Sequence, residues 1–389
     1  MRIGIDIRHL TDPQPAGVGG YTKQLLAALF RLDQKNDYVL LATGMPSTLR
    51  RLPSFDAPNV TVMTVPVPNK LVTGAIALSR HPNLEALIPK EKKPDAWFFP
   101  NHNFIATRLP YAIMVHDLSY EIFPEFFTLK SRLRHGLARS TIKNATTILC
   151  PSWSTKQDLM GIYGIDETKI VVTPLATEQP PLNPLLLPPP PNPSSGRRGD
   201  TAPGPHPEWL PKRYLLSLAT LEPRKNQLSM IEAYEAYRDQ THDDVALVIA
   251  GGKGWKSAAT LRAAKKSRYA KDIHLLGYVD EGQKAELYRR AQVFVFPSFY
   301  EGFGLPVLEA MAAGCPVIAS HTSSLPELVG DAGLLIDPYN VNDVTMAIKL
   351  VLTSDRLRTD LIHKGLRRAE NFSWEATDKQ TLEVLQSLK

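Results

Sequence analysis

Two glutamates, Glu301 and Glu309, lie eight residues apart in the segment FYEGFGLPVLEA. Such a pair could supply the acid and base of a glycosidase, bind one ligand together, or complement the dipole of a helix N-terminus. A glycosidase pair lies roughly 5–9.5 Å apart across a sugar, and this interpretation gives no role to the glycines between the carboxylates. The other two interpretations depend on the elements around the pair.

Those elements predict a strand, a glycine-rich loop and a helix. VFVFPS (293–298) is an apolar strand pattern, Pro306 suits the first turn of a helix, and Gly314 suits its end. Gly302 and Gly304 then lie just ahead of the helix, where backbone N–H groups favour a phosphate. Because a carboxylate can accept hydrogen bonds from a vicinal diol, the pattern fits the ribose, diphosphate and sugar of a nucleotide sugar. A structural role for both glutamates at the helix dipole remains the alternative.

Two cations follow another predicted strand, YLLSLA, in the segment TLEPRKN (220–226). Departure of a diphosphate requires a metal ion or fixed positive charge. No Asp-x-Asp motif follows a predicted strand, so Arg224 and Lys225 are the candidates and no metal is expected. The alternative is a solvated charge pair, although cations at a helix N-terminus oppose the helix dipole.

Two further motifs lie in the N-terminal half. In AGVGGYTKQLL, Gly17, Gly19 and Gly20 precede a predicted helix, but Thr22 replaces the last glycine of a dinucleotide-binding fingerprint. A nicotinamide enzyme is therefore disfavoured, and a glycine loop facing a phosphate or a plain turn remains. His116 ends the predicted strand AIMVH, which places it in a cleft or makes it a structural histidine.

The elements that must position these residues form two sets. Continuous apolar runs alternate with helical patterns before and after a segment, 179–211, that holds 12 of the 33 prolines. Such runs predict strands covered on both faces, in doubly wound parallel sheets. We expect an α/β protein with two facing Rossmann-like domains, an N-terminal one at 1–178 and a C-terminal one at 212–371. A proline-rich linker or insertion at 179–211 separates them, and a C-terminal helix follows at 372–389.

With these motifs identified, the chain resembles the retaining, nucleotide-sugar-dependent glycosyltransferases of the GT-B fold and the family 4 type. SFYEGFGLPVLEAMAAGCPVIAS matches the E-x7-E signature of that family through Glu301 and Glu309. TLEPRKN, VGGYTKQLL and the His-Asp pair at 116–117 match as well. The segment 372–386 resembles the family's C-terminal helix, which crosses back to the N-terminal domain.

The resemblance implies a role for each matching residue. The implied catalytic residues are His116, Lys225 and Glu301. The implied contacts with the sugar donor come from Gly19, Gly20, Arg224, Tyr278, Val279, Glu301, Gly302, Phe303, Gly304, Leu305 and Glu309. Many members carry an arginine near the position of Thr220, whereas this chain has Arg224 beside Lys225, so the division of work between the two cations stays open.

The resemblance also implies an activity. A hexose would pass from a nucleotide-diphosphate sugar to a glycan or lipid-linked acceptor with retention, as in polysaccharide biosynthesis, without a metal or other cofactor. AGVGGYT and TLEPRKN are similar to segments of mannosyl- and rhamnosyltransferases, which favours GDP-mannose. A nucleotide-sugar epimerase of the same fold and a non-catalytic sugar-nucleotide binding module remain alternatives, the latter opposed by His116, Lys225 and Glu301.

Charge and hydropathy limit where the protein is expected to lie in the cell and which partners it is expected to bind. The N-terminus lacks an apolar leader and the chain lacks an 18-residue apolar run, so we expect a cytoplasmic protein. The basic amphipathic pattern at 129–145 could bind the protein peripherally to the inner face of the membrane. The alternative is a domain helix with a solvated basic face. A net charge of +6 spread over 389 residues gives no reason to expect nucleic acid.

Overall fold

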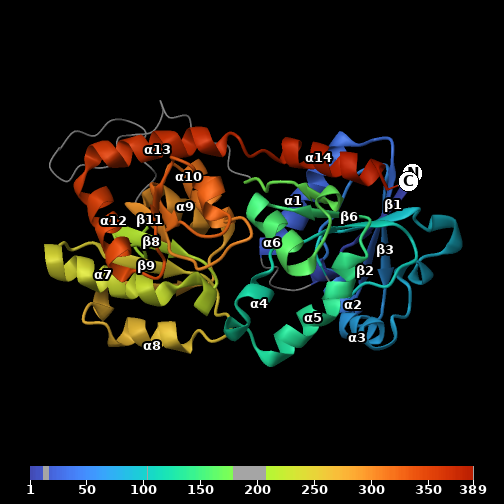
Figure 1. The fold of residues 1–389 in the computed structure, drawn as a ribbon, viewed down its shortest axis with the longest axis horizontal. Coiled ribbons are helices and arrows are strands. Elements are labelled where there is room, and N and C mark those ends of the chain that lie inside the picture. Colours follow the sequence, from blue (N-terminus) through green and yellow to red (C-terminus); the bar gives the residue numbers. More distant parts are fainter. Residues whose placement is uncertain (12–16, 103, 178–206, 389) are drawn as a thin grey trace. The chain divides into compact units, whose positions relative to one another are not determined.

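The structure is a computed structural model that describes residues 1–11, 17–102, 104–177 and 207–388. These residues belong to two compact units, Met1–Leu175 with Ser373–Lys389, and Ala176–Phe372 (Figure 1). The proline-rich linker or insertion expected at 179–211 lies outside the described residues except for 207–211. Each unit is described by itself.

The first unit is built on a seven-stranded parallel sheet of order β3-β2-β1-β4-β5-β6-β7. The strands are mostly apolar and, apart from the edge strands β3 and β7, mostly buried, as is typical of a sheet with helices on both faces. Their bounds are β1 Arg2–Asp6, β2 Asp37–Thr43, β3 Val60–Val65, β4 Ala96–Phe99, β5 Tyr111–Met114, β6 Thr147–Cys150 and β7 Ile170–Val172.

Helices and short 3-10 segments connect these strands. Thr128 and Ser152 cap two of the helices through side-chain hydrogen bonds to backbone N–H groups. The last helix of the chain, α14, packs against α1. The helices are α1 Gly17–Leu32, α2 Pro46–Leu49, α3 Asn69–Ser79, α4 Ser119–Ile122, α5 Leu129–Lys143, α6 Trp153–Tyr163 and α14 Trp374–Gln386, with 3-10 segments Arg8–Thr11, Leu84–Leu87, Lys90–Lys92, Pro124–Phe126 and Glu167–Lys169.

The second unit is built on a six-stranded sheet of order β10-β9-β8-β11-β12-β13, in which every neighbouring pair is parallel. Two parallel α/β sheets confirm the predicted fold class. The order reverses between β8 and β11, which makes this the topological switch point of the sheet. The strands are β8 Tyr214–Leu218, β9 Ala246–Ala250, β10 Ile273–Gly277, β11 Val293–Phe296, β12 Val317–Ser320 and β13 Leu334–Ile336.

Side-chain caps mark the start of several helices of the second unit. Asp280 and Gln283 form a capping box at the start of α9, and Ser354 caps α13. The helices are α7 Gln227–Thr241, α8 Ala258–Lys266, α9 Glu281–Arg290, α10 Leu305–Ala312, α11 Leu325–Val329, α12 Val341–Thr353 and α13 Asp355–Ala369, with 3-10 segments Pro223–Lys225 and Ala270–Asp272. The predicted strand-loop-helix pattern around the two glutamates is confirmed by β11 and α10.

One local prediction was wrong. Gly17, Gly19 and Gly20 were expected in a loop before the helix, but α1 begins at Gly17 and includes all three. A glycine costs only about 1 kcal/mol in a helix interior, and the apolar face of α1, with Tyr21 and Leu25 buried, outweighs this cost. The three glycines therefore form part of the first helical turn.

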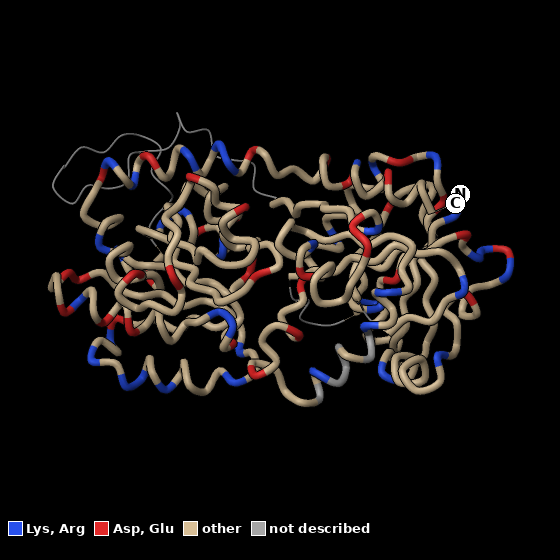
Figure 2. Tube along the Cα trace, in the orientation of Figure 1, with Lys and Arg blue, Asp and Glu red and all other residues tan. Residues whose placement is uncertain are grey.

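The predicted basic helix is present as α5. Leu129, the first leucine of its proposed apolar face, is 69% exposed, while the side chains of Leu133 and Leu137 lie outside those that the structure describes. Lys and Arg residues are interspersed with Asp and Glu in both units (Figure 2). In the described part of the chain no helix combines the length and apolarity of a membrane span.

Candidate functional site

The switch point of the second sheet brings together two segments that carry charged candidate site residues. TLEPRKN follows β8, and SFYEGFG follows β11, its neighbour in the sheet. In open parallel sheets the carboxyl ends of the strands at a switch point diverge and leave room for a ligand. The site residues of the second unit lie at this edge because of that topology.

Glu301 is the centre of this site. Its Oε1 atom accepts hydrogen bonds from Lys225 Nζ at 2.6 Å and from Ser298 Oγ at 2.6 Å. Its Oε2 atom accepts one from Arg224 Nη1 at 3.1 Å. The carboxylate is only 8% exposed. The structure thus assembles Arg224, Lys225 and Glu301, which the sequence predicted as site residues.

Arg224 is fixed by more than Glu301. Its guanidinium pairs with Glu222 at 2.9 Å and donates to the carbonyl of Tyr300 at 2.7 Å. The four charged side chains, two acidic and two basic, therefore compensate one another. Glu222 was not predicted from the sequence, although it stands two residues from Arg224.

The electrostatics of the cluster keep Glu301 ionised. Burial would raise the pKa of Glu301, but the charges and hydrogen bonds of Lys225 and Arg224 lower it below its usual value. Burial, together with the charge of Arg224, lowers the pKa of Lys225. An ionised Glu301 is a hydrogen-bond acceptor and not a general acid.

Glu301 still has capacity to accept a hydrogen bond. A carboxylate offers about four acceptor positions. Among the described residues, Oε1 uses two of them and Oε2 uses one. One position on Oε2 therefore remains for a hydroxyl group of a ligand.

The loop after β12 fixes the backbone of Glu301. The Glu301 N–H group donates to Ser323 Oγ at 2.8 Å, and Ser324 Oγ donates to the Glu301 carbonyl at 2.9 Å. Ser323 lies in the left-handed region at φ 53°. Sequence reasoning missed both serines, whose only signal is that they follow a strand.

Gly304 shapes the start of α10. Its φ of 102° requires glycine, and a Cβ atom there would lie 2.6 Å from Leu325 Cδ2. The N–H groups of Phe303, Gly304 and Leu305 have no acceptor among the described residues. Such N–H groups at a helix start attract anions, so this end of α10 suits a phosphate. The Phe303 side chain is buried against Phe372.

Glu309 lies inside α10 with partners from α9. Lys284 Nζ donates to Glu309 Oε1 at 2.7 Å, and Tyr288 Oη donates to Oε2 at 3.0 Å. Burial raises the pKa of Glu309 in spite of both partners. The sequence predicted Glu309 but gave no signal for Lys284 and Tyr288, because their proximity arises only from the packing of two helices.

Other loops at the same edge lie close together. Gly251, after β9, has φ 139°, and a Cβ atom there would lie 1.9 Å from the carbonyl oxygen of Ala219. Tyr278 and Val279 follow β10, and Tyr278 is 72% exposed. The predicted residues of the second unit therefore all follow carboxyl ends of strands, or lie in α10.

The first unit holds the remaining predicted residues. His116 follows β5, and its Nε2 atom lies 2.9 Å from the carbonyl oxygen of Pro100, after β4. A carbonyl only accepts, so Nε2 carries the proton and Nδ1 is the acceptor. Burial lowers the pKa of His116, which keeps the ring neutral. Tyr21 contacts it edge-on, with ring centroids 4.9 Å apart.

His9 was not predicted, yet it lies at the carboxyl end of β1. Its Nε2 atom is 2.8 Å from Thr22 Oγ1 in α1, and burial lowers the pKa of His9 to about 4. Its position directly after an apolar strand is a signal that could have identified it. Gly20, in the same turn of α1 as Thr22, is exposed with open space around it, whereas Gly19 is buried.

Comparison with known proteins identifies the family. The family model described as Glycosyltransferase Family 4 matches residues 15–177, and that described as Glycosyl transferases group 1 matches 203–368. O-antigen chain mannosyltransferase B of Escherichia coli is 32% identical over 320 residues, 79% of this chain and 78% of that protein. The chain is a group 1 glycosyltransferase of the family 4 type.

Two further comparisons concern a second relative of the glycosyltransferase and its fold. The MMP alpha-(1->4)-mannosyltransferase of Mycolicibacterium hassiacum is 40% identical over 116 residues, 29% of this chain and 28% of that protein. The solved sucrose-phosphate synthase from Thermosynechococcus elongatus superposes with a TM-score of 0.71 at 19% identity, covering 100% of this chain and 99% of that one. The expected GT-B fold is confirmed.

In the part of the chain that the structure describes, no group of three His, Cys, Asp or Glu side chains is placed to hold a metal ion. Lys225 and Arg224 lie at the switch point, where both donate to Glu301, four residues before α10 begins.

Proposed function

We propose that the glycosyltransferase transfers a mannosyl residue, with retention, from GDP-mannose to a glycan or lipid-linked acceptor. The observation that carries this proposal is the cluster of Glu301, Lys225 and Arg224 beside the start of α10. Mannose as the sugar is supported by two of the proteins named above, which are called mannosyltransferases.

The diphosphate of the sugar donor would bind at the N-terminus of α10. The N–H groups of Phe303, Gly304 and Leu305 supply hydrogen bonds, while Gly302 lets the backbone approach the ligand. Lys225 and Arg224 supply the positive charge that a leaving diphosphate requires. Because both cations are paired with Glu301, an incoming phosphate would share them with this carboxylate.

The two glutamates would bind the two sugars of the donor. The open acceptor position on Glu301 suits a hydroxyl group of the mannose, and Glu309 would bind the ribose diol. Tyr278 and Val279 would lie near the base.

We further propose that neither glutamate is a nucleophile. The pKa of Glu301 is lowered and its oxygens are held by cations, which makes the carboxylate a poor proton donor and a weak nucleophile. Retention would then follow from attack on the same face that the leaving group departs, with the leaving phosphate accepting the proton of the acceptor. Lys225 and Arg224 would stabilise the leaving charge in place of a metal.

A panel of nucleotide sugars tests this function. A donor present at about 100 times its Kd stabilises the folded protein by roughly 2.7 kcal/mol, and a more weakly bound donor at the same concentration stabilises it less. GDP-mannose should therefore raise Tm more than GDP-glucose or UDP sugars. Incubation with EDTA and labelled GDP-mannose, with mannose oligosaccharides as acceptors, should then yield GDP and a longer glycan. An epimerised donor, or binding without turnover, would instead favour an epimerase or a binding module.

A further inference from the structure

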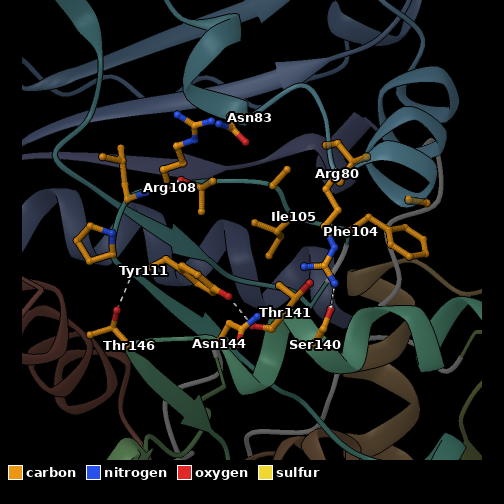
Figure 3. Close-up of a pocket in the computed structure, with 16 residues that line it drawn as sticks. Arg80, Asn83, Phe104, Ile105, Arg108, Tyr111, Ser140, Thr141, Asn144 and Thr146 are labelled. Atoms are coloured by element: carbon orange, nitrogen blue, oxygen red, sulfur yellow. Dashed lines mark hydrogen bonds between the residues drawn. The ribbon is translucent and has the colours of Figure 1, made fainter.

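A pocket lies in the first unit, away from the candidate site residues. It has a volume of about 630 Å³, within the range of small-molecule sites. Arg80, Asn83, Arg108, Ser140 and Asn144 lie around it, with Ile105 between them (Figure 3). We call it the amino-edge pocket, because it lies at the beginnings of β5 and β6.

The position of the pocket separates it from the candidate site. Tyr111, the first residue of β5, and Thr146, directly before β6, line it. His116 follows the other end of β5, five residues from Tyr111, or roughly 16 Å along an extended strand. A ligand in the amino-edge pocket would not occupy the carboxyl edge where His116 lies.

The charge of the pocket is one-sided. Of its 16 lining residues, all within the described part of the chain, two are arginines and none is acidic. The Arg108 guanidinium makes no hydrogen bond or ion pair with another described residue, and Arg80 has one contact, 3.5 Å to Ser140 Oγ. Both arginines are exposed, and the Arg108 backbone N–H group donates to Glu85 Oε1 at 3.0 Å. Because neither guanidinium group pairs with a carboxylate, each can bind an anionic ligand.

The other lining groups suit a ligand with hydroxyl groups. The side-chain amides of Asn83 and Asn144 make no hydrogen bond to other described residues, so their donors and acceptors are available. Phe104 and Ile105 supply an apolar surface that can contact the C–H face of a sugar ring. Tyr111 Oη donates to the Thr141 carbonyl at 2.6 Å, which fixes the tyrosine side chain in the wall of the pocket.

We propose that the amino-edge pocket is a second ligand site, which binds a sugar carrying one phosphate or carboxylate group. Arg80, beside Ser140, binds the anionic group, while Arg108, on the other side of Ile105, and the two asparagine amides bind hydroxyl groups. The Phe104–Ile105 wall contacts the ring. A neutral sugar offers the Arg80 guanidinium no charged partner, and a purely apolar anion offers the amides no hydrogen-bond partner. The shared chemistry of a sugar phosphate and a uronic acid meets all three features.

Isothermal titration of the full chain tests this site with mannose 6-phosphate, glucuronate, mannose and inorganic phosphate as probes. At least one charged sugar should bind tenfold or more tightly than mannose and than inorganic phosphate. Whichever of the two charged sugars binds more tightly identifies the anionic group. Loss of one charged hydrogen-bonding partner should weaken binding about tenfold, so Arg80→Gln and Arg108→Gln should each have this effect.

Two control variants make the result specific. Arg51→Gln removes an exposed arginine of the same unit that does not line the pocket, and it should leave the affinity unchanged. Lys225→Gln alters the candidate sugar-donor site in the other unit, and it should also leave the affinity unchanged. Equal binding of mannose, unaltered binding in the Arg80→Gln, Arg108→Gln double variant, or loss of binding in Lys225→Gln would overturn the proposal.

Discussion

The Lys225 ammonium group lies 2.6 Å from Glu301 Oε1, although the two residues are 76 positions apart in the chain. They meet because β8 and β11 are neighbours in the sheet and each residue lies in the loop after its strand. Both side chains are almost fully buried, at 12% and 8% exposure. A buried pair at a topological switch point indicates a binding function, because replacing such pairs by apolar residues often costs no stability.

The first prediction concerns this pair. Lys225→Ala leaves the Glu301 carboxylate without its shortest ion pair, and breaking a buried pair in this way costs about 3–5 kcal/mol of unfolding free energy. Loss of a group that stabilises the leaving charge should also lower kcat by about 10²–10³. Thermal unfolding and steady-state transfer assays measure the two effects.

A matched control separates the pair from charge removal in general. Arg289 pairs with Glu286 on the surface of α9, where such pairs contribute at most about 1 kcal/mol. Arg289→Ala should therefore leave both Tm and kcat nearly unchanged. A Lys225→Ala enzyme with the kcat of the wild type would show that Lys225 does not act on the leaving group.

The second prediction concerns the backbone at the start of α10. Gly304→Ala forces a Cβ atom to 2.6 Å from Leu325 in a left-handed conformation, which should cost about 1–3 kcal/mol or more. As a control, Gly161→Ala in α6 has open space and helical backbone, so it should stabilise the fold by about 0.4–1 kcal/mol. Chemical denaturation of both variants measures these opposite signs. Equal free energies of unfolding would contradict the strain assigned to Gly304.

The third prediction concerns a buried carboxyl group without a partner. Asp378 in α14 is 1% exposed, neither of its oxygens has a hydrogen-bond partner among the described residues, and burial raises its pKa from 3.8 to about 8. Between these values the native state retains the proton that the unfolded state releases, so stability should fall as pH rises from 4 to 8. Each kcal/mol lost lowers Tm by about 2–4 °C in a unit of this size.

Substitution tests the assignment of this slope to Asp378. Asp378→Asn should remove most of the decline in Tm between pH 4 and pH 8, because the amide does not titrate. Asp37→Asn, at an exposed position of the same unit, should keep it. If the slope survives in Asp378→Asn, another group is responsible.

The fourth prediction concerns the pair of Glu309 and Lys284. Burial already raises the pKa of Glu309, and removal of the Lys284 ammonium group should raise it further. In Lys284→Met a larger fraction of the carboxyl groups would then be protonated at a given pH, and a protonated group accepts fewer hydrogen bonds from a ribose diol. KM for the sugar donor should therefore rise, and the rise should be larger at pH 6.5 than at pH 8.5.

Lys284 has a second, exposed partner that serves as the control. Glu281 is 81% exposed, so Glu281→Gln should leave KM unchanged at both pH values. A KM for Lys284→Met that is raised equally at pH 6.5 and pH 8.5 would argue against protonation of Glu309 as the cause.

Much of this site could be predicted from the sequence because its residues follow strands. Apolar runs identify β8 and β11, and the motifs directly after them supply Arg224, Lys225 and Glu301. The position of Gly304 just before α10 was also predicted, since Pro306 marks the first turn of the helix, whereas its left-handed backbone is seen only in the structure. Local patterns of this kind do not depend on how distant parts of the chain pack.

The rest depends on packing and could not be predicted in the same way. Lys284 and Tyr288 reach Glu309 only because α9 lies against α10, and Ser323 reaches Glu301 through the loop after β12. The start of α1 was misplaced because its three glycines were interpreted as a loop, whereas the buried face of the helix outweighs their low helix propensity.

The most direct test of the central claim is a crystal structure of the protein with GDP-mannose bound. We predict that diphosphate oxygens will lie about 3 Å from Lys225 Nζ and from the N–H groups at the start of α10, with a mannose hydroxyl on Glu301. A nucleotide bound elsewhere, with Lys225, Arg224 and Glu301 free of ligand contacts, would contradict the assignment of this cluster as the sugar-donor site.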